Sequence, residues 1–115
     1  MAGLTSRSLW RLTPVPWRKW RLIQVVNAAD AIPERLPRKG VVAVGIVNCP
    51  TWLAFDCPCA ERHRVMLNLD PSRKPYWSAQ TISSLTISPS IDENRRKARC
   101  HYFVRKGRIE WVPYD

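Results

Sequence analysis

Residues 100–112 read CHYFVRKGRIEWV, and this stretch has the pattern of two strands joined by a turn. Two short runs rich in aromatic and β-branched residues flank Lys106-Gly107, which is a turn signal. Further upstream, every second residue from Val65 to Leu69 is apolar, as expected of a strand with one buried face. Short strands separated by turns, without a long helical pattern, predict a small, mainly β fold with short or few helices.

Three more segments of the sequence fit the same fold. Residues 20–26 end in an apolar run suited to a strand, and VVAVGIV (41–47) is typical of a buried strand. The connector IPERLPRKG (32–40) contains two prolines and a glycine, which favour turns over a helix. Residues 81–91 alternate, and one face of that strand is expected to hold Leu85, Ile87, Pro89 and Ile91.

The chain has 115 residues, which suits one compact domain. The apolar run at 41–47 is too short to cross a bilayer, and the first residues lack the apolar middle of a signal peptide. We therefore expect a cytoplasmic protein without a membrane segment. Its predicted organisation is a basic, Trp- and Pro-rich arm at 1–20 and a single catalytic-type β domain at 21–115.

The net charge of +10 is concentrated at the two ends of the chain. Residues 1–40 hold 8 basic and 2 acidic groups, residues 41–92 hold 4 of each, and residues 93–115 hold 7 and 3. Such ends favour acidic partners. The interleaved Trp and Arg of WRLTPVPWRKWRL suit base stacking or a protein interface, but no nucleic-acid-binding motif accompanies them. Nucleic acid is therefore the less favoured partner.

The cysteines form the first candidate site. Cys57 and Cys59 lie two residues apart, His63 follows four residues later, and Cys100 lies about forty residues downstream. Two thiolates from one turn plus ligands from a distant strand can build a tetrahedral zinc site, which predicts structural zinc. Ordinary buried thiols are the alternative interpretation. Cys49 follows an apolar strand and is expected to pack rather than bind metal.

Ser90 and His101 form the second candidate site. They lie near the ends of consecutive strands, so pairing of those strands would bring the hydroxyl to a base that can take its proton. Asp92 or Asp70 would then orient the imidazole, as in a catalytic triad. Two alternatives remain open: Ser90-x-x-Glu93 is also a capping box that opens a short helix, and His101 can be a zinc ligand or a core histidine.

The order of short motifs also resembles a known family. FDCPCAERHRVMLNLDP, YWS, SLTISPSI and CHYFVRKGRIEWV follow one another as in the BubE-like peptidases of bacterial ubiquitination-like (Bub) operons. The upstream IQVVNAADAIPERLPRKGVVAVG is similar to the opening strand and turn of that family, so the resemblance covers roughly residues 20–112. It implies a serine-dependent, deubiquitinase-like peptidase, with a ubiquitin-like protein and E1- and E2-like enzymes as partners.

Carried over by position, the Pro-Ser motif of the family falls on Pro89-Ser90 and makes Ser90 the implied nucleophile. The histidine before the final hairpin falls on His101, the implied general base. The cysteine knuckle falls on Cys57 and Cys59, but Glu61 stands at its third cysteine position. Cys100 also departs from the family pattern, because it is adjacent to the histidine instead of a few residues before it.

Three functions are compatible with these residues. The first is a peptidase that processes or removes a ubiquitin-like protein, with Ser90 as nucleophile and zinc as a structural ion. The second is a zinc-stabilised binding module that contacts nucleic acid or an acidic protein through its basic, Trp-rich surface. The third is a hydrolase with catalytic zinc on Cys57, Cys59 and His101, which cysteine-rich ligation disfavours.

Overall fold

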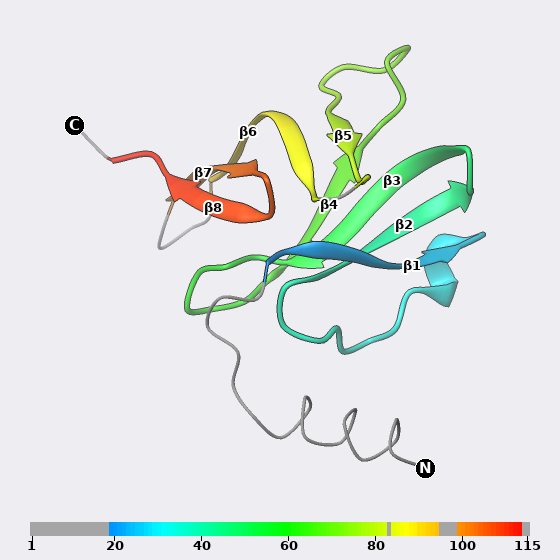
Figure 1. Ribbon diagram of the computed structural model, residues 1–115, viewed down its shortest axis with the longest axis horizontal. Helices are drawn as coiled ribbons and strands as arrows, with labels where there is room; N and C mark the ends of the chain where they lie inside the picture. The colour runs from blue at the N-terminus through cyan, green and yellow to red at the C-terminus, as the bar shows by residue number, and fades with distance from the viewer. Residues whose placement is uncertain (1–18, 83, 95–98, 114–115) are drawn as a thin grey trace.

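The computed structural model describes residues 19–82, 84–94 and 99–113, which fold into two four-stranded sheets (Figure 1). The strand orders are β1-β2-β3-β4 and β5-β6-β7-β8. The strands are β1 (Arg21–Val26), β2 (Gly40–Ile46), β3 (Cys49–Asp56), β4 (Arg64–Asn68), β5 (Ser78–Gln80), β6 (Thr86–Asn94), β7 (Arg99–Arg105) and β8 (Arg108–Trp111). The single helical element in this described part is a 3-10 turn, η1 (Ala29–Ala31). The prediction of a mainly β fold is confirmed.

Hairpins connect most neighbouring strands. β1 and β2 pair in parallel, and every other neighbouring pair is antiparallel. The β7–β8 hairpin turns at Lys106 and Gly107, whose φ angles are 51° and 77°. Two consecutive positive φ angles match the right-handed twist of the flanking strands, which explains why this dipeptide turns the chain. The expected turn is therefore present.

One hydrophobic core joins the two sheets. Phe55 and Leu67 of the first sheet and Tyr102 of the second are at most 2% exposed and belong to one cluster. Trp20 closes the core at the chain's entry, since it is buried and its ring lies edge-on to Phe55 at 5.8 Å between centroids. The backbone N–H of Trp20 also donates to the Gly107 carbonyl (2.8 Å). Most of the expected N-terminal arm, residues 1–18, lies outside the described residues.

The alternation seen in the sequence matches the burial. Val65 and Leu67 are buried and Leu69 is half-buried, while Met66 between them is exposed. No helix in the described ranges is long and apolar enough to cross a bilayer. The two faces of β7 differ in the same way: Cys100, Tyr102 and Val104 face the core, and His101 lies on the outer face.

Candidate active site and metal centre

Ser90 and His101 meet on the outer face of the second sheet. β6 and β7 pair antiparallel, as expected, and the Ser90 Oγ lies 2.9 Å from the His101 Nε2. Both side chains are half-buried. A hydroxyl at hydrogen-bond distance from an imidazole nitrogen is the arrangement in which the imidazole can take the hydroxyl proton.

An irregular segment of β6 brings the serine to this position. Ile87 pairs with Val104 and Ile91 pairs with Tyr102, so three residues of β6 stand opposite Phe103 alone. Extra residues in one strand of a pair bend that strand and re-aim its side chains. Pro89 is consequently exposed, which makes the expectation that it shares a buried face with Leu85 wrong.

Trp77 forms a hydrogen bond with the backbone carbonyl of Ser90. Its indole Nε1–H donates to the Ser90 C=O at 3.2 Å. Sequence reasoning did not single out this tryptophan. The only available signal was its place in the YWS motif, because hydrogen bonds between distant loops leave no periodic pattern in a sequence.

An aspartate lies directly across the strand pair from the histidine. Asp92 is the cross-strand partner of His101, and its carboxylate accepts two hydrogen bonds from Arg99, one of them at 2.9 Å from Nε. The hydrogen bond from Arg99 lowers the pKa of Asp92, burial opposes this, and the charge of Arg99 adds to the lowering. Asp92 is thus an anion at the position opposite His101, with its carboxylate paired to Arg99. Asp70 instead accepts hydrogen bonds within a turn, from the Ser72 backbone and hydroxyl.

The capping-box interpretation of Ser90 is wrong. Residues 86–94 form the extended strand β6, so Ser90 lies within a strand and Glu93 pairs with Cys100. The strand prevails because the alternating apolar residues of this segment enter the core, and that burial outweighs a local capping preference.

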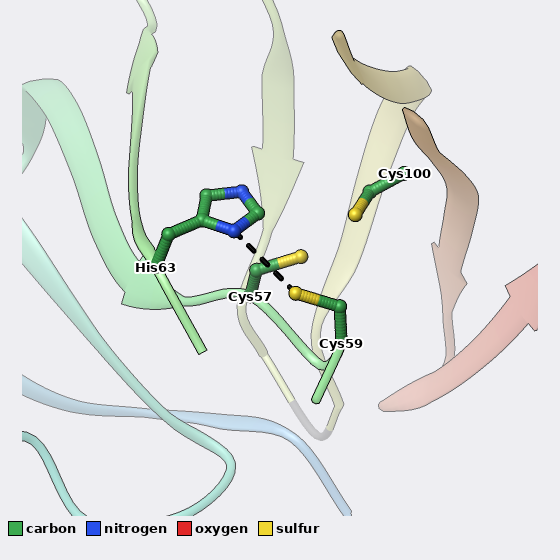
Figure 2. Close-up of side chains that lie close together, drawn as sticks. All are labelled: Cys57, Cys59, His63 and Cys100. Atoms are coloured by element: carbon green, nitrogen blue, oxygen red, sulfur yellow. Dashed lines mark hydrogen bonds between the residues drawn. The ribbon is translucent and has the colours of Figure 1, made fainter. Parts of the chain in front are cut away.

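The candidate zinc ligands converge on the inner side of the same sheet (Figure 2). One ligand atom from each of Cys57, Cys59, His63 and Cys100 lies within 4.8 Å of the others. Three of these residues come from the loop between β3 and β4, and Cys100 comes from β7 in the other sheet. The Cys59 Sγ lies 3.4 Å from the His63 Nδ1. The two cysteines, the histidine and the distant cysteine therefore occur together, as the spacing predicted.

The protonation of the thiols reflects their crowding. Burial raises the pKa of Cys57, and burial together with the Cys57 and Cys59 thiols raises the pKa of Cys100 to about 12. The pKa of Cys59 is lowered despite burial, because backbone groups of Arg62 and Glu61 and the Cys57 thiol hydrogen-bond to it. A divalent cation would stabilise Cys100 as a thiolate, although the neighbouring thiols oppose its ionisation.

The four residues fit a zinc ion. Tetrahedral zinc with Zn–S bonds of about 2.3 Å separates its sulfurs by about 3.8 Å, so ligand atoms within 4.8 Å need only a small contraction. Glu61, at a cysteine position of the family, is exposed and outside this cluster. His101 is also outside it, so the cluster does not use the ligand set of the catalytic-zinc hypothesis. Cys49 is exposed, which makes the expectation that it packs wrong.

A cavity of about 400 Å³ is lined by the residues of β6 that directly follow Ser90, although neither Ser90 nor His101 lines it. Ile91, Asp92 and Glu93 of β6 form one wall, and Trp52 and Met66 of the first sheet form the other. Trp77 also lines it, so the tryptophan that binds the Ser90 carbonyl connects the pair to the cavity. Trp52 and Met66 are 36% and 38% exposed, which is high for large apolar side chains within strands.

A second cavity, of about 580 Å³, lies near the cysteine loop and is strongly basic. Its lining includes five cationic side chains and one acidic side chain, Asp56, which is paired with Arg64. The cationic residues are Lys19, Arg38, Lys39, Arg62 and Arg108. They come from segments that are distant in sequence, so positive charge from both ends of the chain and from the cysteine loop surrounds one hollow.

Fold and site together define a small β protein with a serine–histidine pair on one face of a sheet and, on the other, a cysteine-rich cluster that could hold a metal ion. The chain belongs to the BubE family: the family model described as "Bacterial ubiquitination-like system serine protease (BubE)" matches residues 28–112. The resemblance seen in the sequence is confirmed, and the family name implies a serine protease of a bacterial ubiquitination-like system. No curated protein and no solved structure matches the chain.

Proposed function

We propose that this protein is a serine peptidase that cuts at the C terminus of a bacterial ubiquitin-like protein, either to mature it or to release it from a target. Ser90 is the nucleophile and His101 the general base. The observation that carries the proposal is the 2.9 Å contact between the Ser90 Oγ and the His101 Nε2 in a member of a serine protease family. The ubiquitination-like system in the family name supports the proposed substrate class.

The reaction proceeds by acyl transfer. The Ser90 Oγ attacks the carbonyl carbon while the His101 Nε2 takes the hydroxyl proton, and the imidazolium then gives that proton to the leaving amine. Water, deprotonated by the same imidazole, hydrolyses the acyl-serine and frees the carboxylate. Pro89 has no N–H, so the backbone donor nearest the developing oxyanion is the Ser90 N–H.

Asp92 has a supporting role in this proposal. Its ionised carboxylate lies across from His101 and stabilises the imidazolium that forms when the serine loses its proton. Arg99 keeps the carboxylate charged and in place through two hydrogen bonds. Asp92 thus acts on the histidine without touching the substrate carbonyl.

Zinc would be held by Cys57, Cys59, His63 and Cys100 and would supply structural cross-linking. Cys100 immediately precedes His101 in β7, and the other three ligands belong to the β3–β4 loop of the opposite sheet. Holding Cys100 therefore fixes the strand that carries the general base. Three cysteine ligands and one histidine leave no open position for a reacting water in a tetrahedral site.

The basic cavity is the surface proposed for acidic partners. Five cations around one hollow favour an acidic face of the ubiquitin-like protein or of its E1- and E2-like enzymes. The same cavity supports the second candidate function, a zinc-stabilised binding module for nucleic acid. Contacts to several phosphates would make affinity for random single-stranded DNA fall steeply with salt, and a weak, flat salt response would remove this candidate.

Intact mass spectrometry tests the peptidase. The ubiquitin-like protein of the same system, carrying a C-terminal extension, is incubated with wild type, Ser90→Ala, His101→Ala and the matched control Ser88→Ala. Ser88 is an exposed serine two residues earlier in the same strand. We expect cleavage by wild type and Ser88→Ala only. Cleavage by folded Ser90→Ala equal to wild type would refute the serine mechanism.

A further inference from the structure

The free edge of β6 is the starting point for a further inference, which rests on the proposed function. β5 pairs with β6 only from Thr86 to Ser88. Beyond Ser88, no strand in the described part of the chain pairs with that side of β6, while β7 pairs with the other side as far as Asn94. An open strand edge thus begins beside Ser90.

The hydrogen-bonding pattern shows which backbone groups point out of this edge. The Val112 N–H donates to the His101 C=O at 2.9 Å, so the backbone polar groups of His101 face away from β6. In an antiparallel pair, the residue opposite then also points its N–H and C=O away from its partner strand. That residue is Asp92. Its backbone groups therefore face the open side, as does the Ser90 carbonyl that accepts from Trp77.

The cavity of about 400 Å³ lies against this same edge, with Asp92 and Glu93 in its lining. Trp52, Met66 and Trp77 form its apolar part, called the apolar pocket below, and the cations Arg73 and Lys74 also line the cavity. Free backbone donors and acceptors beside an apolar pocket are the two elements of strand-addition recognition. Main-chain hydrogen bonds give affinity, and pockets for alternate side chains give specificity.

We infer that the edge of β6 at residues 92–94 binds the C-terminal tail of the substrate as an added strand. The tail places one large apolar side chain in the pocket between Trp52, Met66 and Trp77 and leads its scissile carbonyl to Ser90. The occupant is an extended peptide because Asp92 and Asn94, two residues apart, present backbone groups to the same side. It carries an apolar residue because two indoles and a thioether, from Trp52, Trp77 and Met66, form the apolar part of the lining beside the cations Arg73 and Lys74.

Binding is measured without turnover, on the full chain carrying Ser90→Ala. The probe is a fluorescently labelled synthetic peptide with the tail sequence of the ubiquitin-like protein, followed by fluorescence anisotropy. Adding Met66→Lys should raise the Kd at least 10-fold, since it puts a charge into the apolar pocket. The matched control is Ile46→Lys, an apolar residue at the β2–β3 turn that is 73% exposed and outside this cavity. A Kd for Met66→Lys within twofold of the control would overturn the inference.

A second set of binding measurements varies the peptide and leaves the protein unchanged, so no further variant has to fold. Each peptide bond of the tail is N-methylated in turn, which removes one donor and blocks one strand contact. Strand addition predicts that affinity falls at alternate positions only. Equal affinity for all methylated peptides would also overturn the inference.

A separate measurement tests the proposed serine mechanism independently of tail binding. A fluorophosphonate probe labels an activated serine, so the wild type should be labelled at Ser90 and the Ser90→Ala variant should not. Absence of labelling in the wild type would refute the serine mechanism, whereas the anisotropy series would still decide whether the β6 edge binds the tail.

Discussion

Replacement of Cys100 by alanine is the sharpest test of the metal centre. Cys100 is the one ligand contributed by the second sheet, so its loss should weaken zinc binding and disconnect the β3–β4 loop from β7. Cys49→Ala is the matched control, because Cys49 is the one cysteine outside the cluster and is exposed.

The size of the effect follows from the ligand count. Structural zinc in small domains contributes about 10–16 kcal/mol, so each of four ligands accounts for roughly 3–4 kcal/mol. A difference of about 1.4 kcal/mol is tenfold in affinity, so the zinc Kd of Cys100→Ala should rise about 100- to 1000-fold. Cys49→Ala should bind zinc as the wild type does.

The assay combines metal content with stability. Zinc per chain is measured by elemental mass spectrometry, and affinity by competition with a chromogenic chelator. The melting temperature is then recorded with and without EDTA. Chelation should lower the melting temperature of the wild type and of Cys49→Ala far more than that of Cys100→Ala, because the last has little bound zinc left to lose. Equal zinc affinity in the two alanine variants would refute the assignment of Cys100 as a ligand.

Three further predictions concern the residues around the serine and the β7–β8 turn. Trp77→Phe removes the hydrogen bond to the Ser90 carbonyl, worth about 0.5–1.5 kcal/mol, so kcat for tail cleavage should fall roughly 2- to 10-fold with little change in KM. Asp92→Asn should lower the free energy of unfolding at neutral pH, as measured in urea. Arg99 holds the pKa of Asp92 below the ordinary value near 4, so the stabilisation by the Asp92–Arg99 pair is present above that pH and is lost as the pH falls through the lowered pKa. A difference in unfolding free energy between wild type and Asp92→Asn that stays constant at all pH values would contradict this prediction. Gly107→Ala should destabilise the fold by about 1–3 kcal/mol in the same assay, because φ is +77° and the added Cβ would lie 2.6 Å from a side-chain carbon; unchanged stability would show that the turn relaxes freely.

The sequence was sufficient to predict a mainly β fold and which side chains come together within each of the two candidate sites. Alternation in residues 64–69 and 100–104 reports burial directly, because one face of each strand enters the core. Consecutive strands joined by a short segment usually pair, which is why Ser90 and His101 were expected to meet and do so. The convergence of the four candidate ligands was expected because cysteines and a histidine at such spacing can build a tetrahedral zinc site.

The rest depended on tertiary contacts that leave no local signal. The irregular pairing of residues 88–90 exposes Pro89, which strict alternation had buried. Cys49 begins a strand near a sheet corner and is exposed, although its apolar neighbours suggested packing. Trp52 and Met66 became wall residues only when two sheets came together around the cavity. No periodicity within either strand reports that the opposite wall belongs to β6.

Adjacent residues of β7 belong to the two candidate sites, because neighbouring side chains of a strand point to opposite faces of the sheet. Cys100 faces the cluster and His101, its neighbour, faces the serine, so a slip of β7 by one position would exchange the two sides. The imidazole would then turn toward the thiols, and the thiol would turn toward the hydroxyl. Under the proposed roles, a misaligned chain would lose its general base and its Cys100 ligand in the same step. A metal ion held by the Cys100 thiolate would consequently report that the neighbouring histidine is aimed at the serine.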